Sequence, residues 1–348
     1  MRLPPSRLWA RRPGKNPRPG LAGRRPGVAA GALAILCVAA TITGCQASGT
    51  AASGSGQITV AASRGVADAP LYLAARDGLF SKAGLKVTIE TSTSDATNLH
   101  ALTKGTVDVA AADYTDFFYV QSNIDSGLKL VADGYDAAPN VMGVLALPGS
   151  RLSTPQSLIG KTIGTPQPEE FPYQASAPYS LETLATQSVL LNDGVQPTQV
   201  RWRAIPEQNL VGALKNHRVD AILVSEPYMY QAESQLGATE VIDSLSGATA
   251  NLPLSGYFTS GSFARSNAGA LRTFRSVLLQ AQAEAATGNG VRTVIAHAPQ
   301  INTLTADMVT LGVYPATLNV SGVQQLANLM ADYSMVAVPV DVSSITFR

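Results

Sequence analysis

Residues 101–117 read ALTKGTVDVAAADYTDF, and residues 213–228 read ALKNHRVDAILVSEPY. In both stretches an Ala-Leu pair is followed, after four residues, by Val-Asp and a short apolar run, at an offset of 112 residues (213 − 101). This pattern is typical of a helix end, a tight turn and a buried strand. It predicts two similar α/β units in series, although strand–helix alternation of any origin would produce part of it.

The regions around the two stretches continue the alternation. In the first half we predict strands at Ile58–Ser63, Lys86–Thr91, Val107–Ala112 and Leu128–Gly134, and helices at Pro70–Gly84 and around Leu99–Lys104. After Pro148 the pattern restarts, with strands predicted at Lys161–Pro166, Gln199–Ile205 and Val219–Ser225 and helices at Ser180–Gly194 and Asn209–Arg218. Helical patterns dominate from Ala268 onward. Such alternation predicts an α/β protein with largely parallel sheets covered by helices on both faces.

Polar residues follow the equivalent strands of the two units. Asp113 and Tyr114 end the first quoted apolar run, and Glu226 and Tyr228 follow the second. Ligands of open α/β sheets bind beyond the carboxyl ends of the strands. A carboxylate beside an aromatic ring suits a ligand with N–H donors and a flat face. Capping of the next helix is the alternative role for both carboxylates, and the sequence favours it less for Glu226 because Pro227 fits the first turn of a helix.

The N-terminal 44 residues have the composition of an export signal. They hold eight Lys and Arg and no Asp or Glu, and residues 27–43 form an uncharged, mainly apolar run. Ile42-Thr43-Gly44-Cys45 resembles the bacterial lipoprotein box, in which the cysteine is lipidated and becomes the new N-terminus. We therefore expect a signal peptide at 1–44, lipidation of Cys45 and a Ser/Gly-rich tether at 45–57. A retained membrane anchor is the alternative.

The composition of the remaining chain excludes several classes of protein. Without residues 1–44 the charge is near −7 (25 − 8 − 24), which argues against nucleic acid as a partner. No cysteine follows Cys45, so neither an internal disulfide nor a Cys–His dyad is available. His100, His217 and His297 are far apart in the sequence, and neither a P-loop nor a nucleophile elbow occurs. We expect no metal, no cofactor and no enzymatic activity.

Four segments carry a family resemblance: Asp68–Glu90, Ala101–Phe117, Leu158–Pro166 and Arg218–Tyr228. They resemble the substrate-binding lipoproteins of ABC importers, in the class that includes receptors for alkanesulfonates, taurine, nitrate and thiamine pyrimidine precursors. The resemblance implies the type II periplasmic-binding-protein fold, in which two α/β lobes are joined by a hinge and close on a solute in a central cleft. It also implies crossovers near Leu145–Pro148 and Ser246–Ser255. Lobe 1 would then comprise residues 58–147 and 251–348, with C-terminal helices, and lobe 2 residues 148–250.

The resemblance adds further candidates for ligand binding. Ser63 and Arg64 follow the first strand, where the class has a loop facing the ligand, although Arg64 is equally compatible with a solvated surface charge. Thr165, Phe171 and Tyr173 belong to a loop, residues 165–180, that is longer and richer in proline than in many relatives. This loop could act as a lid or as a stiff surface excursion. Its two acidic residues argue against a sulfonate or nitrate ligand. Trp202 is expected to pack in the core.

We therefore expect an exported, monomeric solute receptor attached to the outer face of the membrane, which delivers its solute to an ABC permease. The excess of carboxylates over cations near the strand ends favours an amino-heterocycle such as a thiamine pyrimidine precursor. An alkanesulfonate, taurine or nitrate receptor is the first alternative. A pyrimidine-synthase-like enzyme is the second, although the chain lacks the cysteine-rich motif that this resemblance would require. A lipid-anchored sensor module is the third.

Overall fold

The structure is a computed structural model that describes residues 56–348, except 124–126, 168–179, 289 and 299–300. Cys45, the predicted signal peptide and the predicted tether lie outside the described residues, apart from the last two positions of the tether. Residues 51–348 belong to one compact unit. In the part of the chain that is described, every helix is too short or too polar to cross a lipid bilayer.

The first sheet, which we call sheet A, contains five strands within the described residues: β1 (Gly56–Ser63), β2 (Leu85–Ser92), β3 (Val109–Asp113), β4 (Leu128–Asp136) and β10 (Pro253–Ser260). They lie in the order β2-β1-β3-β10-β4. β1 pairs in parallel with β2 and β3, whereas β10 runs antiparallel to both β3 and β4. The segment that completes the centre of sheet A therefore comes from far along the chain.

The second sheet, sheet B, is also five-stranded as described: β5 (Met142–Ala146), β6 (Thr162–Pro166), β7 (Arg201–Ile205), β8 (Ala221–Ser225) and β9 (Thr239–Asp243). Its order, β7-β6-β8-β5-β9, repeats that of sheet A, with β5 in the place of β10. β6 is parallel to β7 and β8, and β5 is antiparallel to β8 and β9. The predicted α/β fold with two similar units is confirmed.

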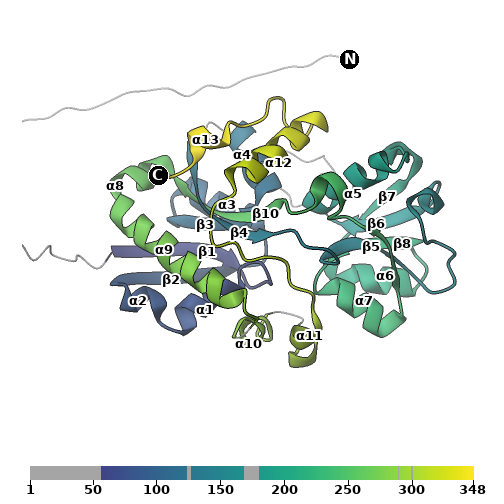
Figure 1. Ribbon diagram of the computed structural model, residues 1–348, viewed down its shortest axis with the longest axis horizontal. Helices are drawn as coiled ribbons and strands as arrows, with labels where there is room; N and C mark the ends of the chain where they lie inside the picture. Colours follow the sequence, from purple (N-terminus) through teal and green to yellow (C-terminus); the bar gives the residue numbers. More distant parts are fainter. Residues whose placement is uncertain (1–55, 124–126, 168–179, 289, 299–300) are drawn as a thin grey trace, which may run out of the picture. The chain divides into compact units, whose positions relative to one another are not determined.

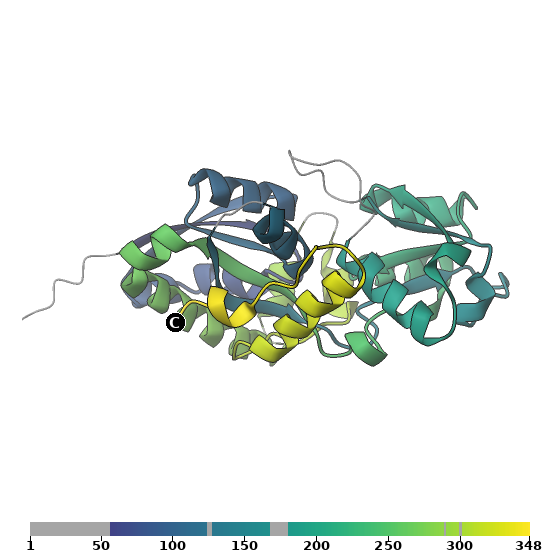
Figure 2. The same ribbon diagram turned by 90° about the horizontal axis from the view of Figure 1, so that it is seen from above.

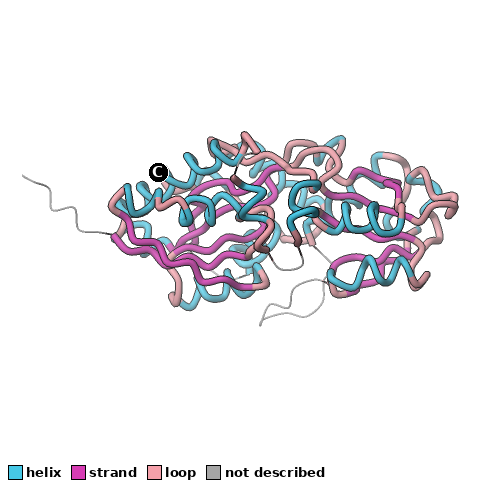
Figure 3. Tube along the Cα trace, turned by 90° about the horizontal axis from the view of Figure 1, so that it is seen from below, coloured by secondary structure: helices cyan, strands magenta, loops and turns pink. Residues whose placement is uncertain are grey.

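Helices cover both faces of each sheet (Figure 3). Their bounds are α1 (Ala69–Arg76), α2 (Leu79–Lys82), α3 (Asp95–Lys104), α4 (Tyr114–Asn123), α5 (Leu181–Asn192), α6 (Leu210–Lys215), α7 (Tyr228–Leu236), α8 (Gly261–Ser266), α9 (Ala268–Ala285), α10 (Val291–Ile295), α11 (Thr303–Met308), α12 (Val320–Asp332) and α13 (Val342–Ile345). Short 3-10 helices occupy Pro155–Leu158, Pro197–Gln199, Glu207–Asn209 and Gly247–Thr249. The single helix predicted at Pro70–Gly84 is in fact two, because Gly78 between them adopts a left-handed conformation.

The helices pack on the sheets through extensive apolar cores. α1 and α9 share one face of sheet A, where the rings of Phe80 and Phe274 stack with centroids 5.5 Å apart. α3, α4 and α12 lie on the other face, and Figure 2 shows α12 and α13 (yellow) against this part of the molecule. On sheet B, α6 and α7 share a separate core. Trp202 is half-buried against the main core, as predicted.

The repeated Val-Asp pair has the same structural role in both sheets. The Asp108 carboxylate accepts the N–H of Thr59 at 2.8 Å, and its own N–H donates to the Thr59 carbonyl at 2.9 Å. Asp220 makes the equivalent pair with Thr162 at 2.8 and 2.9 Å. Before each Asp the helix ends at a left-handed residue, Gly105 or His217. The repeat thus reflects one way of joining β3 to β1 in sheet A and β8 to β6 in sheet B.

The chain passes between the sheets twice. We define the first crossing as residues 137–141, between β4 and β5, and the second crossing as residues 244–252, between β9 and β10 (Figure 1). The first crossing precedes the predicted segment Leu145–Pro148, because β5 pairs with β8 and β9 and so belongs to sheet B. The second overlaps the predicted segment Ser246–Ser255. A hydrogen bond of 2.8 Å from Ala137 N–H to the Leu252 carbonyl joins the two crossings.

Candidate functional site

The strand registers place the candidate residues at one edge of each sheet. In sheet A, Ser255 near the start of β10 is opposite Asp113 at the end of β3, and Pro253 is opposite Asp136 at the end of β4. In sheet B, Met142 at the start of β5 is opposite Ser225 at the end of β8. The first crossing connects these edges, and an extended chain from Asp136 to Met142 spans at most about 22 Å. The edges at which these residues lie are therefore near each other, and a crevice shared by the two edges stays a prediction.

The loop after β1 is held by a residue that the sequence analysis did not single out. Asp68 is buried, and its carboxylate accepts hydrogen bonds from the Ser63 N–H at 3.0 Å, the Ser63 hydroxyl at 2.9 Å and the Tyr257 hydroxyl at 3.4 Å. Burial raises the pKa of Asp68 to about 6, against the lowering effect of these hydrogen bonds. An Asp directly before an Ala-Pro helix start looks like an ordinary helix cap. In the structure its carboxylate instead closes the loop after β1 by accepting two hydrogen bonds from Ser63.

Arg64 lies in this loop with its side chain exposed. Its guanidinium carbon is 5.0 Å from the centre of the Tyr72 ring, which is a cation–π arrangement. The Tyr72 hydroxyl is 3.1 Å from the Thr91 hydroxyl. The structure thus gives Arg64 a partner on α1 while leaving it accessible at the sheet edge.

At the end of β3 the two candidate residues have different environments. Asp113 is half-buried, and its N–H donates to the Asp95 carboxylate at 2.6 Å. Tyr114 is completely buried, and its hydroxyl donates to the Asp133 carboxylate. Asp133 also accepts the Asn319 N–H at 2.5 Å, and burial raises its pKa to about 6. Tyr114 therefore packs in the core in this structure, where its ring does not reach a ligand.

At the end of β8 the fold uses the carboxylate that we expected to meet a ligand. One oxygen of Glu226 accepts the Tyr230 N–H of α7 at 3.1 Å, and the other accepts the Thr310 N–H at 2.8 Å. Burial raises the pKa of Glu226, and these backbone donors lower it. Tyr228 is half-buried, and burial together with the Glu207 charge raises its pKa to about 12.

The remaining candidates are only partly described. Thr165 is buried near the end of β6. Phe171 and Tyr173 lie outside the described residues, so their predicted roles stay predictions. In the described ranges no group of His, Cys, Asp and Glu side chains is arranged to hold a metal ion.

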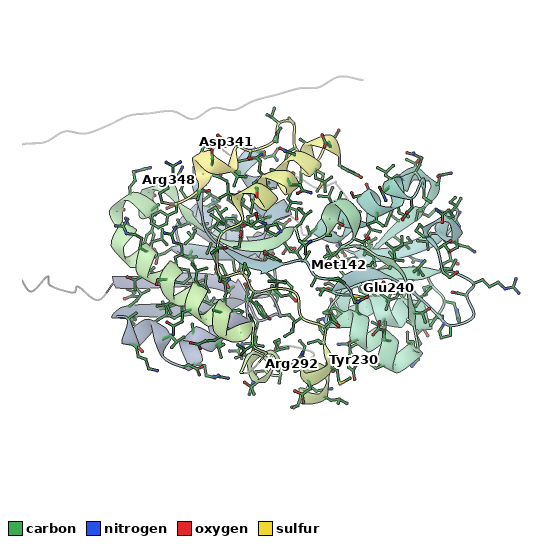
Figure 4. The ribbon with its side chains drawn as sticks, viewed as in Figure 1. Met142, Tyr230, Glu240, Arg292, Asp341 and Arg348 are labelled. Carbon is green, nitrogen blue, oxygen red and sulfur yellow. The ribbon has the colours of Figure 1, made fainter. Side chains whose placement is uncertain are left out.

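Two further half-buried carboxylates, one on each sheet, were not singled out from the sequence. Asp136 ends β4 at the candidate edge of sheet A, whereas Glu240, labelled in Figure 4, is the second residue of β9 and lies opposite Leu145 of β5. Each has one buried oxygen without a hydrogen-bond partner among the described residues. Burial, together with nearby acidic charge, raises the pKa of each to about 7. Asp136 therefore adds a second half-buried carboxylate to Asp113 at the edge of sheet A.

Solved structures share this architecture at low sequence identity. The periplasmic aliphatic sulphonate binding protein SsuA from Escherichia coli is 17% identical, with a TM-score of 0.67 over 84% of this chain and 97% of that chain. The periplasmic nitrate-binding protein NrtA from Synechocystis PCC 6803 is 13% identical, with a TM-score of 0.65 over 83% and 86%. The CA3427 gene product of Candida albicans, described as having the generic periplasmic binding protein fold, is 14% identical, with a TM-score of 0.63 over 83% and 95%. The expected periplasmic-binding-protein fold is confirmed.

A search of curated proteins found no match to the chain. A family model described as NMT1/THI5 like matches residues 67–288. These residues span most of sheet A and all of sheet B, including the four segments on which the resemblance rests. The chain therefore belongs to the NMT1/THI5-like family.

Proposed function

We propose that the protein is an extracytoplasmic solute receptor of an ABC importer, which binds a small organic solute between its two sheets without transforming it. The observation that carries the proposal is that both sheets have the same strand order and that two crossings connect their neighbouring edges. This arrangement allows hinge closure on a solute. Family membership and likeness to binding proteins for aliphatic sulphonate and nitrate support the same function.

We infer that the solute is neutral or cationic and carries N–H donors, as an amino-heterocycle does. Asp113 and Asp136 are half-buried at the edge of sheet A where β3 and β4 end, and Arg64 is a cation in the loop after β1. An anionic solute would be repelled by such carboxylates unless they were protonated. Tyr228 and Ser63 are the proposed neutral contacts. Glu226 and Tyr114 are left out because the fold engages the carboxylate of the first and buries the ring of the second.

A thermal-shift screen of small solutes tests the receptor proposal. A solute at a hundredfold excess over its dissociation constant should stabilise the protein by about 2.7 kcal/mol. We expect Asp113→Asn to weaken binding of an amino-heterocycle about tenfold, as loss of a charged hydrogen bond would. The exposed Asp77→Asn variant is the matched control and should bind normally. Consumption of the solute would point to an enzyme. Tight binding of an alkanesulfonate, with Asp113→Asn inert, would overturn the ligand assignment.

We further propose that Cys45 anchors the protein to the outer face of the membrane through a lipid. The basic region, apolar run and Ile42–Cys45 motif support this. The intact mass of protein extracted from membranes should correspond to a chain that begins at Cys45 and carries a diacylglycerol. A water-soluble product with another N-terminus would contradict the proposal.

A further inference from the structure

A segment near the C-terminus, residues 309–314, extends sheet A at the first crossing. Val313 and Asp136 exchange two backbone hydrogen bonds, of 2.8 and 3.0 Å, in an antiparallel bridge. The Gly312 N–H donates to the Tyr135 hydroxyl, and the Tyr314 hydroxyl donates to the Val66 carbonyl at 2.8 Å. A Cβ atom at Gly312 would lie 2.5 Å from the Asp136 carbonyl oxygen, so this close approach requires glycine. The segment is therefore fixed to sheet A at several points.

The same segment is tied to sheet B through Glu226. This residue directly follows β8, and its N–H donates to the Val141 carbonyl of the first crossing at 2.9 Å. Its carboxylate accepts the N–H of Thr310 at 2.8 Å and that of Tyr230 at 3.1 Å. α11, which precedes the segment, packs on α7, and Figure 1 shows the chain leaving α11 beside α7. One carboxylate thus joins the first turn of a sheet B helix to a segment that is bridged to the end of β4 in sheet A.

We propose that residues 309–314 form a third, non-covalent hinge strand and that Glu226 is the latch that fastens it to sheet B. The latch stabilises the arrangement in which the sheet edges are near each other. Glu226 then affects solute affinity only through the equilibrium between open and closed arrangements, without touching the solute. This last step rests on the proposed function, whereas the latch itself does not.

Both backbone donors favour this role over ligand binding. Each Glu226 oxygen already accepts a well-aligned backbone N–H, and charge-assisted bonds of this kind are among the stronger hydrogen bonds in proteins. When a latch of this kind opens, the N–H of the already exposed Thr310 loses its carboxylate acceptor and can exchange with water. The two amides therefore report the state of the latch directly.

Hydrogen exchange of the full-length protein without any solute tests the latch. In Glu226→Ala the amides of Thr310 and Tyr230 should exchange at least about tenfold faster than in the wild type. Glu226→Gln, which keeps one acceptor oxygen, should fall between the two. Asp77→Asn is the control, because Asp77 is an exposed carboxylate on the sheet A side that pairs with Arg76. Unchanged exchange at Thr310 in Glu226→Ala would overturn the proposal.

A second variant removes the donor and leaves Glu226 in place. Val309 has φ −57° and ψ 139°, which is the conformation that a residue before proline prefers, so Thr310→Pro is compatible with the backbone on that side. Small-angle scattering of the solute-free protein should show a larger radius of gyration for Thr310→Pro and Glu226→Ala than for the wild type. If Glu226→Ala weakens solute binding but Thr310→Pro does not, Glu226 contacts the solute and the latch proposal is wrong. Failure of every solute to bind would contradict the proposed function and leave the exchange result standing.

Discussion

Tyr114→Phe should lower the free energy of unfolding by about 2–4 kcal/mol at neutral pH. The substitution removes only a hydroxyl group, but this group donates to Asp133 inside the core of sheet A. Among the described residues, the Asp133 carboxylate would keep the Asn319 N–H as a donor while its desolvation cost stays the same. Denaturant titration of the full-length protein at pH 7.5 measures the loss.

The origin of this effect can be separated from a loss of packing. Protonation removes the charge of Asp133, so the cost of Tyr114→Phe should shrink when the pH is lowered below about 6. In an Asp133→Asn background the same substitution should also cost less, because a neutral amide is less expensive to bury. An equal cost at pH 7.5 and pH 5 in both backgrounds would show that the hydroxyl does not stabilise a buried charge.

The free energy of unfolding should fall as the pH is raised from about 4 to about 7. Burial raises the pKa of Asp68 and of Asp133 from 3.8 to about 6, and that of Asp136 and Glu240 to about 7. Between the ordinary and the raised values the folded protein holds protons that the unfolded chain has released, so a rise in pH favours unfolding. Each group contributes a slope of at most about 1.4 kcal/mol per pH unit. Asp68 and Asp133 are the most buried, and each predicts a loss of order 3 kcal/mol.

Denaturant titrations at intervals of one pH unit measure this dependence. Asp68→Asn should flatten the curve between about pH 4 and pH 6, because the amide keeps an acceptor oxygen for Ser63, places its NH2 group toward the Tyr257 hydroxyl and does not titrate. Asp77→Asn should leave this part of the curve unchanged, since Asp77 is exposed and its pairing with Arg76 lowers its pKa. Stability that rises steadily from pH 4 to pH 7 would contradict the prediction.

Local patterns predicted most of the parallel strands and their order along the chain. Ile58–Ser63, Lys86–Thr91 and Lys161–Pro166 agree with β1, β2 and β6 to within two residues. The strands that were not predicted, β5, β9 and β10, are those that directly precede or follow one of the two crossings. β10 reads as an ordinary apolar stretch, and its central place is determined by pairing with β3 and β4, which are distant in sequence.

The position of the candidate site followed from the strand ends, but the use of each side chain did not. Glu226 satisfies backbone donors, one of which lies 84 residues away in the sequence. The Tyr114 hydroxyl donates to Asp133, whose position within the apolar strand β4 gave no sign of this partner. Asp68, Asp136 and Glu240 carry no motif, and their raised pKa values come from burial in the assembled fold. Such roles depend on partners that no local pattern reveals.

The position of β10 between β3 and β4 determines the order in which the two sheets can be completed during synthesis. Sheet B is built from the continuous stretch between β5 and β9, so all its strands are present once residue 243 has left the ribosome. At that moment β4 has no neighbour in sheet A within the described chain, because its partner there is β10. The later-starting half can therefore close first, while the earlier one keeps two open strand edges until residues 253–260 arrive. In a nascent chain, sheet B can thus form before sheet A is complete. Any truncation before residue 253 leaves the unpaired β4 as an aggregation-prone edge.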